Sequence, residues 1–318
     1  MVDTDAAALI REAELNHRLA LAHPGRRFLP VSGSRWGELI LPAPDEAAAP
    51  MTGLRLAMFA SWEFGYMALE AVRAYARRFP GRVQLVGLAT DDPMNQTARI
   101  GLKKRIWKFM DRREIVAIET AMVASALAAG VPAYTGEIKT DGFRALLEAW
   151  RPDAIISCVF GQVVDRWIID RPAYGIYNFH GSDLAHGHGA GPAPAADLAA
   201  RGDTTTAVTV HQVSEAIDAG PIVAVSPPIN VQDLGGTLPA DSLMLYDKMI
   251  EVVGCLVAGL VDALSHRFAA GARGKLDSLD AAAAIPAEVQ ARLREPIRAR
   301  GHLDTLPRFD PALLAGFR

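Results

Sequence analysis

Short apolar runs alternate with helix-like segments through the middle of the chain, and this alternation restricts the possible folds more than any other feature. Runs that predict buried strands cover residues 54–61, 83–90 and 151–160. Segments with apolar residues at helical spacing lie between them, at 62–79, 115–131 and 141–150. Strands separated by helices form parallel β-α-β units, so we expect an open, mostly parallel, Rossmann-like α/β sheet with helices on both faces. Ligands of such sheets bind outside the carboxyl ends of the strands.

Two further pieces flank this α/β core. Residues 1–52 are expected to form an N-terminal extension, in which a helix-like segment precedes a Gly-punctuated hairpin or loop at 27–44. The α/β piece is expected to cover residues 53–232. Residues 233–318 are expected to form a mainly helical C-terminal region, because apolar residues recur at helical spacing from 240 to 268.

Composition excludes several classes of protein. Half of the 318 residues are hydrophobic and the formal net charge is −3, so we expect a packed core and no nucleic-acid partner. Cys158 and Cys255 lie inside apolar runs, which favours buried reduced thiols. The N-terminus is too acidic for a signal peptide, and the longest apolar run, 252–261, is shorter than the ~20 residues that span a bilayer. We therefore expect a cytoplasmic protein with no membrane partner.

Residues 177–192, YNFHGSDLAHGHGAGP, concentrate most of the chemistry. His180, His186 and His188 are close together, but they lack the helical spacing of zinc hydrolases, and Asp183 is the one acidic residue at a recognisable distance. We therefore expect no metal. The first strand ends in FASWEFG, which lacks the glycine fingerprint of dinucleotide-binding proteins and disfavours a nicotinamide cofactor.

A series of spaced residues runs through and beyond this stretch: Gly175, Asn178, His180, Ser182, Gly189, Pro192, Gly202, Thr206, Thr209, Asp218, Gly220, Pro221 and Ile222. In order and spacing, these residues resemble the signature of the folate-dependent formyltransferases. That family includes glycinamide ribonucleotide, methionyl-tRNA and sugar-nucleotide N-formyltransferases, together with formyltetrahydrofolate hydrolases. The resemblance covers roughly residues 53–232.

The resemblance implies that Asn178, His180 and Asp218 are catalytic. They would transfer a formyl group from N10-formyltetrahydrofolate, the cosubstrate, to an amine through a tetrahedral intermediate. Asn178 can donate from its amide to the oxyanion, and His180 can donate as an imidazolium or deliver a proton. Asp218 suits the role of base and orienting group. Taken singly, Asn178 and Asp218 could each be turn residues, and His180 a structural histidine.

The resemblance also assigns the walls of the site. The folate would contact the loop after Cys158 and the segment before Asp218, through Phe160, Gly161, Gln162, Val163, Val213, Glu215 and Ile217. The loop after the catalytic strand would face the acceptor, through Ser182, His186, His188 and Gly189. Ser182 is expected to bond the loop backbone, and His211, inside AVTVHQV, is expected to be structural. A basic run is either a solvated helix face or a contact to an anionic group: Lys103, Lys104, Arg105, Lys108, Arg112 and Arg113.

The acceptor stays open at this point. The loop SDLAHGHGAGP departs from the Leu-Leu-Pro and Arg-Gly pattern of many family members. A small-molecule amine, such as a nucleotide-linked amino sugar, is favoured. A tRNA acceptor is disfavoured, because the tail is short, helical at first and not strongly basic. The alternatives are a formyltetrahydrofolate hydrolase, a methionyl-tRNA formyltransferase without the usual C-terminal barrel, and a binding protein on the same fold. The apolar helix at 240–268 could serve as core or as a homo-oligomer interface.

Overall fold

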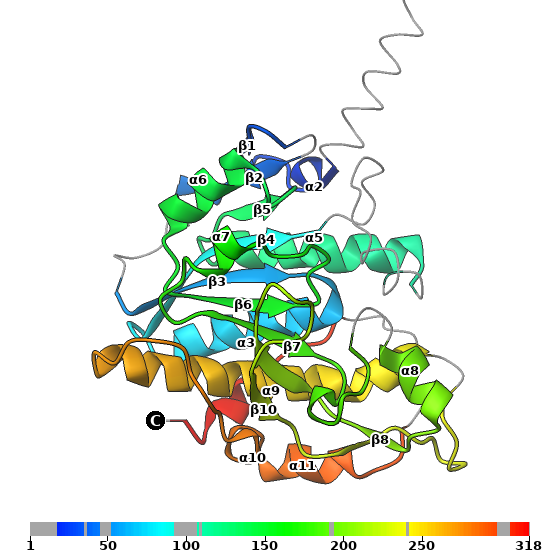
Figure 1. Ribbon diagram of the computed structural model, residues 1–318. Helices are drawn as coiled ribbons and strands as arrows, with labels where there is room; N and C mark the ends of the chain where they lie inside the picture. Colours follow the sequence, from blue (N-terminus) through cyan, green and yellow to red (C-terminus); the bar gives the residue numbers. More distant parts are fainter. Residues whose placement is uncertain are drawn as a thin grey trace, which may run out of the picture.

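The computed structural model of the chain describes residues 18–34, 37–44, 52–91, 107, 110–190, 194–239, 242–297 and 306–317. Within these residues, nine strands form one sheet in the order β1-β2-β5-β4-β3-β6-β7-β9-β10 (Figure 1). The strands are β1 (Phe28–Pro30), β2 (Glu38–Ile40), β3 (Leu54–Ala60), β4 (Val83–Thr90), β5 (Ala133–Thr135), β6 (Ala154–Cys158), β7 (Ile176–His180), β9 (Thr209–Gln212) and β10 (Ile222–Val225). The central strands from β5 to β7 are parallel, and antiparallel strands flank them on both sides. The predicted open, mostly parallel α/β sheet is therefore confirmed.

The helices cover both faces of this sheet, as the sequence predicts. The larger ones are α3 (Trp62–Arg78), α5 (Arg112–Ala128), α6 (Asp141–Trp150), α8 (Pro194–Arg201) and α9 (Ser242–Ala269). The shorter ones are α2 (Arg18–Leu21), α7 (Arg166–Ile169), α10 (Ala281–Ala284), α11 (Ala287–Leu293) and the 3₁₀ helices η3 (Leu184–His186) and η4 (Pro311–Leu314). A small second sheet pairs β8 (Thr205–Thr206) with β11 (Ile229–Asn230).

Side-chain alternation along β3 divides the interior into two cores. Leu56 and Met58 point into the core that α3, α5 and α9 cover, whereas Ala57 and Phe59 point into the core that α6 and α7 cover. Because both faces of β3 are buried, this strand is a continuous apolar run rather than an alternating one. The central strand is thus held from both sides, and its carboxyl end is fixed in place.

The two flanking pieces of the chain join the same sheet and core. The hairpin of β1 and β2 adds to the sheet through antiparallel pairing of β2 with β5. Helix α9 packs along α3 (Figure 1), and its buried residues belong to the same core as those of α3. The division at residues 52 and 232 stays a prediction.

Helix α9 also carries the strongest apolar segment of the described residues. By length and composition, Leu243–Ala269 could cross a membrane, but 78% of its most apolar window is buried inside the structure. This burial fits the core role that the sequence offered as one of two options. The cytoplasmic location stays a prediction. Cys158 and Cys255 are both buried and unbonded, as expected from their apolar surroundings.

Candidate active site

A cleft with a cavity volume of about 170 Å³ opens where β6 and β7 end. Asn178 and His180, both on β7, line it together with Asp218, which lies on the loop between β9 and β10. The residues expected to contact folate also line it: Phe160, Gly161, Gln162, Val163, Val213, Glu215 and Ile217. The chain fold therefore brings the predicted catalytic and folate-binding residues into one cleft.

A buried carboxylate holds the loop after β6 in position. Asp91, which follows β4, is 1% exposed and accepts hydrogen bonds from Gly161 N at 2.5 Å and Gln162 Nε2 at 3.2 Å. Gln162 Nε2 also donates to Gly136 O at 2.9 Å, and its Oε1 accepts from Ile138 N at 3.1 Å. These contacts use the Gln162 side chain to hold the loop in place. The loop therefore offers backbone groups, rather than this side chain, to a ligand in the cleft. Asp91 is not among the site residues predicted from the sequence, although its place directly after a buried strand marks it as a candidate.

The opposite wall of the cleft is a tight turn that ends at Asp218. Asp218 has a left-handed backbone, with φ at +53°, a conformation that aspartate tolerates better than most residues. Gly220 approaches the neighbouring strand so closely that a Cβ on it would lie 1.7 Å from Gln212 O. A glycine is therefore required at 220, and its close approach fixes the direction from which Asp218 enters the site.

Apolar side chains at the rim of the cleft are unusually exposed. Val163 is 40% exposed and Ile217 is 55% exposed, one on each wall. Large apolar side chains left in water beside a cleft are typical of a surface that contacts a ligand.

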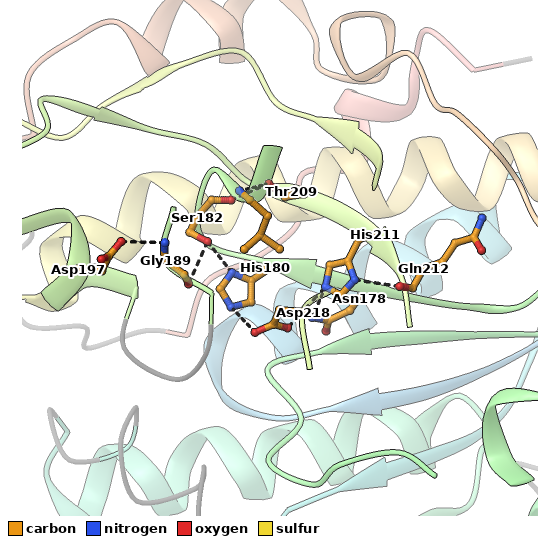
Figure 2. Close-up of polar contacts among 10 residues, drawn as sticks. Asn178, His180, Ser182, Gly189, Asp197, Thr209, His211, Gln212 and Asp218 are labelled. Atoms are coloured by element: carbon orange, nitrogen blue, oxygen red, sulfur yellow. Dashed lines mark hydrogen bonds and ion pairs between the residues drawn. The ribbon is translucent and has the colours of Figure 1, made fainter. Parts of the chain in front are cut away.

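His180 lies in a chain of polar contacts that runs from the loop backbone to Asp218 (Figure 2). The Ser182 hydroxyl donates to Gly189 O at 3.3 Å, so Ser182 Oγ can accept from His180 Nδ1–H at 2.7 Å. On the other side of the ring, His180 Nε2 lies 3.4 Å from Asp218 Oδ2. An imidazolium satisfies both contacts, because it donates from both ring nitrogens. Ser182 bonds the loop backbone as predicted, and it also orients the histidine.

His211 lies beside both Asn178 and Asp218. It lies opposite Asn178 on the neighbouring antiparallel strand, with Asn178 Nδ2 at 3.1 Å from His211 Nε2. His211 Nδ1–H donates a hydrogen bond to Gln212 O at 3.0 Å. Nε2 then carries no proton and accepts a hydrogen bond from the Asn178 amide. His211 Nε2 is also 3.6 Å from Asp218 Oδ1. The local sequence predicts only a structural histidine at 211, because it does not contain the cross-strand register that brings His211 to Asn178.

The predicted acceptor-side loop lies beside the cleft rather than in its lining. His186 is exposed and pairs with Asp183 at 2.7 Å, and His188 Nδ1 lies 3.9 Å from Asp203 Oδ2. Gly189 N donates to Asp197 Oδ2 at 2.8 Å, which ties the end of the loop to α8. Among the described residues, no group of three or more histidines, cysteines or carboxylates could hold a metal ion. Pro192 and, from the basic run, Lys103, Lys104, Arg105 and Lys108 lie outside the described residues.

An aromatic cluster forms the other end of the cleft. Phe64 of α3 and Tyr246 of α9 line the cleft, with ring centroids 5.8 Å apart. Trp62 packs behind both rings, at 5.2 Å from Phe64 and 5.3 Å from Tyr246. Burial raises the pKa of Tyr246 to about 12, so its phenol stays neutral at physiological pH. Local sequence patterns do not predict this wall, because its residues come from helices far apart in the chain.

Part of the chain matches the model of a known protein family. A family model described as formyl transferase matches residues 119–239, a range that holds Asn178, His180, His211 and Asp218. This part of the chain is similar to the formyl transferase family. The family signature that the sequence analysis identified is thereby confirmed.

Similar proteins carry several formyltransferase names. The methionyl-tRNA formyltransferase of Acidobacterium capsulatum is 35% identical over 144 residues, which are 43% of this chain and 45% of that protein. The methionyl-tRNA formyltransferase of Anaplasma marginale is 37% identical over 105 residues, which are 33% of this chain and 34% of that protein. The chain thus matches less than half the length of these curated relatives.

Two solved structures resemble its fold more loosely. Phosphoribosylglycinamide formyltransferase from Anaplasma phagocytophilum is 17% identical with a TM-score of 0.47, and the match covers 67% of this chain and 89% of that one. A sugar N-formyltransferase from Shewanella is 14% identical with a TM-score of 0.46, covering 70% of this chain and 73% of that one. The similarity to the formyl transferase family rests on the sequence match at residues 119–239.

Proposed function

We propose that this protein transfers a formyl group from N10-formyltetrahydrofolate to the amine of a small-molecule acceptor. The observation that carries the proposal is the arrangement of Asn178, His180 and Asp218 around one end of the cleft, with His211 hydrogen-bonded to Asn178. Similarity to the formyl transferase family supports the reaction type, and the acceptor and donor are our inference.

The proposed reaction needs hydrogen-bond donors at a developing negative charge. The folate supplies the formyl group, and the attack of the amine nitrogen moves charge onto the formyl oxygen. The second N–H of the Asn178 amide and the Nε2–H of His180 are the donors available to this oxygen. Donors that are already oriented stabilise such charge without reorganisation, and each is worth roughly 2.7–4 kcal/mol in comparable enzymes.

Asp218 and His180 would also move the protons. The amine loses a proton as its nitrogen forms a bond to the formyl carbon, and the folate nitrogen gains one as its bond to that carbon breaks. Asp218 accepts the proton from the amine, and the imidazolium of His180 supplies one for the leaving nitrogen. The number of protons on the protein is the same before and after the transfer.

His211 acts through Asn178 in this scheme and is a positioning residue. Its Nε2 accepts one hydrogen of the Asn178 amide, so the remaining hydrogen faces the cleft. The amide is thus fixed in its donating orientation before any substrate binds.

The folate would lie between the two walls described above. The loop 160–163 offers backbone groups, and Val163 and Ile217 offer apolar contacts at the rim. This end of the cleft suits a flat ring system with polar edges, which is the character of a pterin.

The direct test is release of tetrahydrofolate from N10-formyltetrahydrofolate, followed by absorbance without any amine and then with a panel that includes amino-sugar nucleotides. Release that depends on one small amine supports the proposal. Release without any amine indicates a hydrolase. Release that requires methionyl-tRNA indicates that this tRNA, which appears in the names of the curated relatives, is the acceptor. Either result overturns the assignment of a small-molecule amine as acceptor. His180→Ala should abolish the release, whereas His266→Ala, at an exposed histidine of α9, should leave it unchanged.

A further inference from the structure

A stretch of the C-terminal region, residues 275–279, lies against the strands that position the catalytic residues. We call this stretch the rear segment. Leu279 N donates to Val223 O of β10 at 2.8 Å. At the other end, Lys275 is so close to the glycine before β7 that a Cβ on that glycine would lie 2.9 Å from Lys275 Cγ. Between these contacts, Leu276 is bonded to both β7 and β9.

Two side chains, one from each strand, hold the backbone of Leu276. Its N–H donates to the Tyr177 hydroxyl at 2.6 Å, and its carbonyl accepts from Gln212 Nε2 at 3.2 Å. All three residues are buried, so both hydrogen bonds lie in an interior where they are stronger than in water. The Tyr177 hydroxyl donates in turn to Tyr174 O at 2.7 Å. Burial raises the pKa of this hydroxyl, which therefore keeps the proton that it donates.

These two side chains form the cross-strand pair next to the one in the site. Tyr177 lies opposite Gln212, and the following pair along the strands is Asn178 opposite His211. Successive side chains of a strand point to opposite faces of the sheet. The pair that includes Asn178 therefore faces the cleft, while the pair that includes Gln212 faces the rear segment. The contact behind the sheet thus holds the register that brings His211 to Asn178.

Gln212 also sets the tautomer of His211 through its backbone. Its carbonyl accepts the Nδ1–H of His211 at 3.0 Å (Figure 2), and Nε2 then accepts from the Asn178 amide. The N–H of Gln212 donates to Pro221 O at 2.8 Å, which holds the same peptide from the β10 side. A displaced Gln212 would release the Nδ1 proton and permit the other tautomer, whose Nε2–H cannot accept from Asn178.

We propose that the rear segment is part of the catalytic unit, and that Tyr177 and Gln212 are positioning residues that hold His211 in its Nδ1–H tautomer. The kinetic part of this inference rests on the proposed function. The range 119–239 that matches the family model contains both side chains but not the Leu276 peptide that they hold. The C-terminal region thus supplies a contact on which the orientation of the Asn178 amide depends.

Gln212→Met tests the first contact, because methionine keeps the length of the side chain and cannot donate to Leu276 O. With the amine that gives release in the assay above, we expect kcat to fall about fivefold or more, as for the loss of one hydrogen bond. The KM for N10-formyltetrahydrofolate should stay unchanged. Gln290→Met is the matched control, because Gln290 also donates to backbone carbonyls but does not line the cleft. It should retain the kcat of the unmodified protein.

Tyr177→Phe tests the second contact with a smaller change, the loss of one hydroxyl group. It should also lower kcat without changing this KM, and it provides the test if Gln212→Met does not fold by circular dichroism. Tyr75→Phe removes another buried hydroxyl, which donates to Asp262 at 2.7 Å, and is the control. In the double variant of Tyr177 and Gln212, the loss of kcat should be smaller than the product of the two single losses, because both side chains hold one residue.

The tautomer of His211 can be measured without turnover, by NMR of ¹⁵N-labelled imidazole groups at pH 8, where an ordinary histidine is neutral. We expect the Nδ1–H tautomer in the unmodified protein and in both controls. Gln212→Met and Tyr177→Phe should each show a fraction of the Nε2–H tautomer. A role limited to stability would lower the free energy of unfolding and leave this spectrum unchanged.

The outcomes for the inference and for the proposed function are distinct. If both variants retain the Nδ1–H tautomer, or match their controls in kcat, the inference is overturned and the proposed transfer is unaffected. Absence of turnover in the unmodified protein refutes the transfer. The spectrum of His211 then decides the inference alone: a tautomer change in the variants supports it, and an unchanged spectrum overturns it.

Discussion

Replacing Asp91 with alanine should loosen the loop that forms the folate end of the cleft. Asp91 is almost fully buried and accepts hydrogen bonds from Gly161 N and Gln162 Nε2. Alanine leaves both donors without this partner. The loop 160–163 would then shift relative to β4, and the folate wall would lose its preformed shape.

The size of the effect follows from these contacts. A hydrogen bond to a charged group contributes roughly 1.5–3 kcal/mol, which gives about 3–6 kcal/mol for the two. Gly161 and Gln162 are half-buried, so water can replace part of the hydrogen bonding that they lose. Removing a buried carboxylate also relieves the cost of its desolvation. We therefore expect Asp91→Ala to lower the free energy of unfolding by about 2 kcal/mol, within a total of ~5–15 kcal/mol for a protein of this kind. Asp91→Asn keeps one oxygen acceptor and should cost about 1 kcal/mol.

Urea unfolding gives the free energy, and steady-state kinetics gives the KM for N10-formyltetrahydrofolate. We expect Asp91→Ala to raise this KM about tenfold, which corresponds to ~1.4 kcal/mol of binding. Asp170→Ala is the matched control, because Asp170 forms an exposed ion pair with Arg166 whose contribution is at most ~1 kcal/mol. If Asp91→Ala unfolds like the unmodified protein and keeps its KM, the clamp has no role in shaping the folate wall.

Three further predictions follow from the site and the core. His211→Leu should lower kcat about tenfold or more with little change in the KM for folate, because the Asn178 amide loses its fixed orientation. In steady-state kinetics, a change in KM without a change in kcat would contradict the positioning role of His211. Gly220→Ala should cost more than ~3 kcal/mol in urea unfolding, because its Cβ would overlap Gln212 O, and a cost below ~1 kcal/mol would show that the turn adapts. Burial raises the pKa of the Cys158 thiol, and it raises the pKa of the Cys255 thiol to about 12. Both thiols should therefore stay protonated at pH 8 and resist iodoacetamide until the protein unfolds, which mass spectrometry would detect.

Local patterns predicted the central elements closely. The run at 83–90 forms β4 and the segment at 141–150 forms α6 with the expected bounds. Their boundaries are locally encoded: Thr140, for example, caps α6 by accepting from Phe143 N. Buried parallel strands and well-capped helices carry their signal in their own residues, which explains the agreement.

Features that depend on distant pairing were not visible. The sequence predicts a hairpin or a loop at 27–44, and the structure has the hairpin of β1 and β2. Its addition to the sheet through β5 depends on a partner about a hundred residues away. The same holds for the site. Asn178 and Asp218 could be chosen from the family signature, whereas His211 acquires its contact through the register of β9 on β7, and Tyr246 through the packing of α9 on α3.

The most direct test of the proposed transfer uses an isotopically labelled formyl group and an amine, with mass spectrometry of the product, in the unmodified protein and in His180→Ala. We expect a labelled formamide with the unmodified protein and none with the variant, while both bind N10-formyltetrahydrofolate with similar affinity in calorimetry. A labelled formamide formed at the same rate by His180→Ala would contradict the central role of this histidine. Loss of folate binding together with an unfolded circular dichroism spectrum would assign His180 a structural role instead.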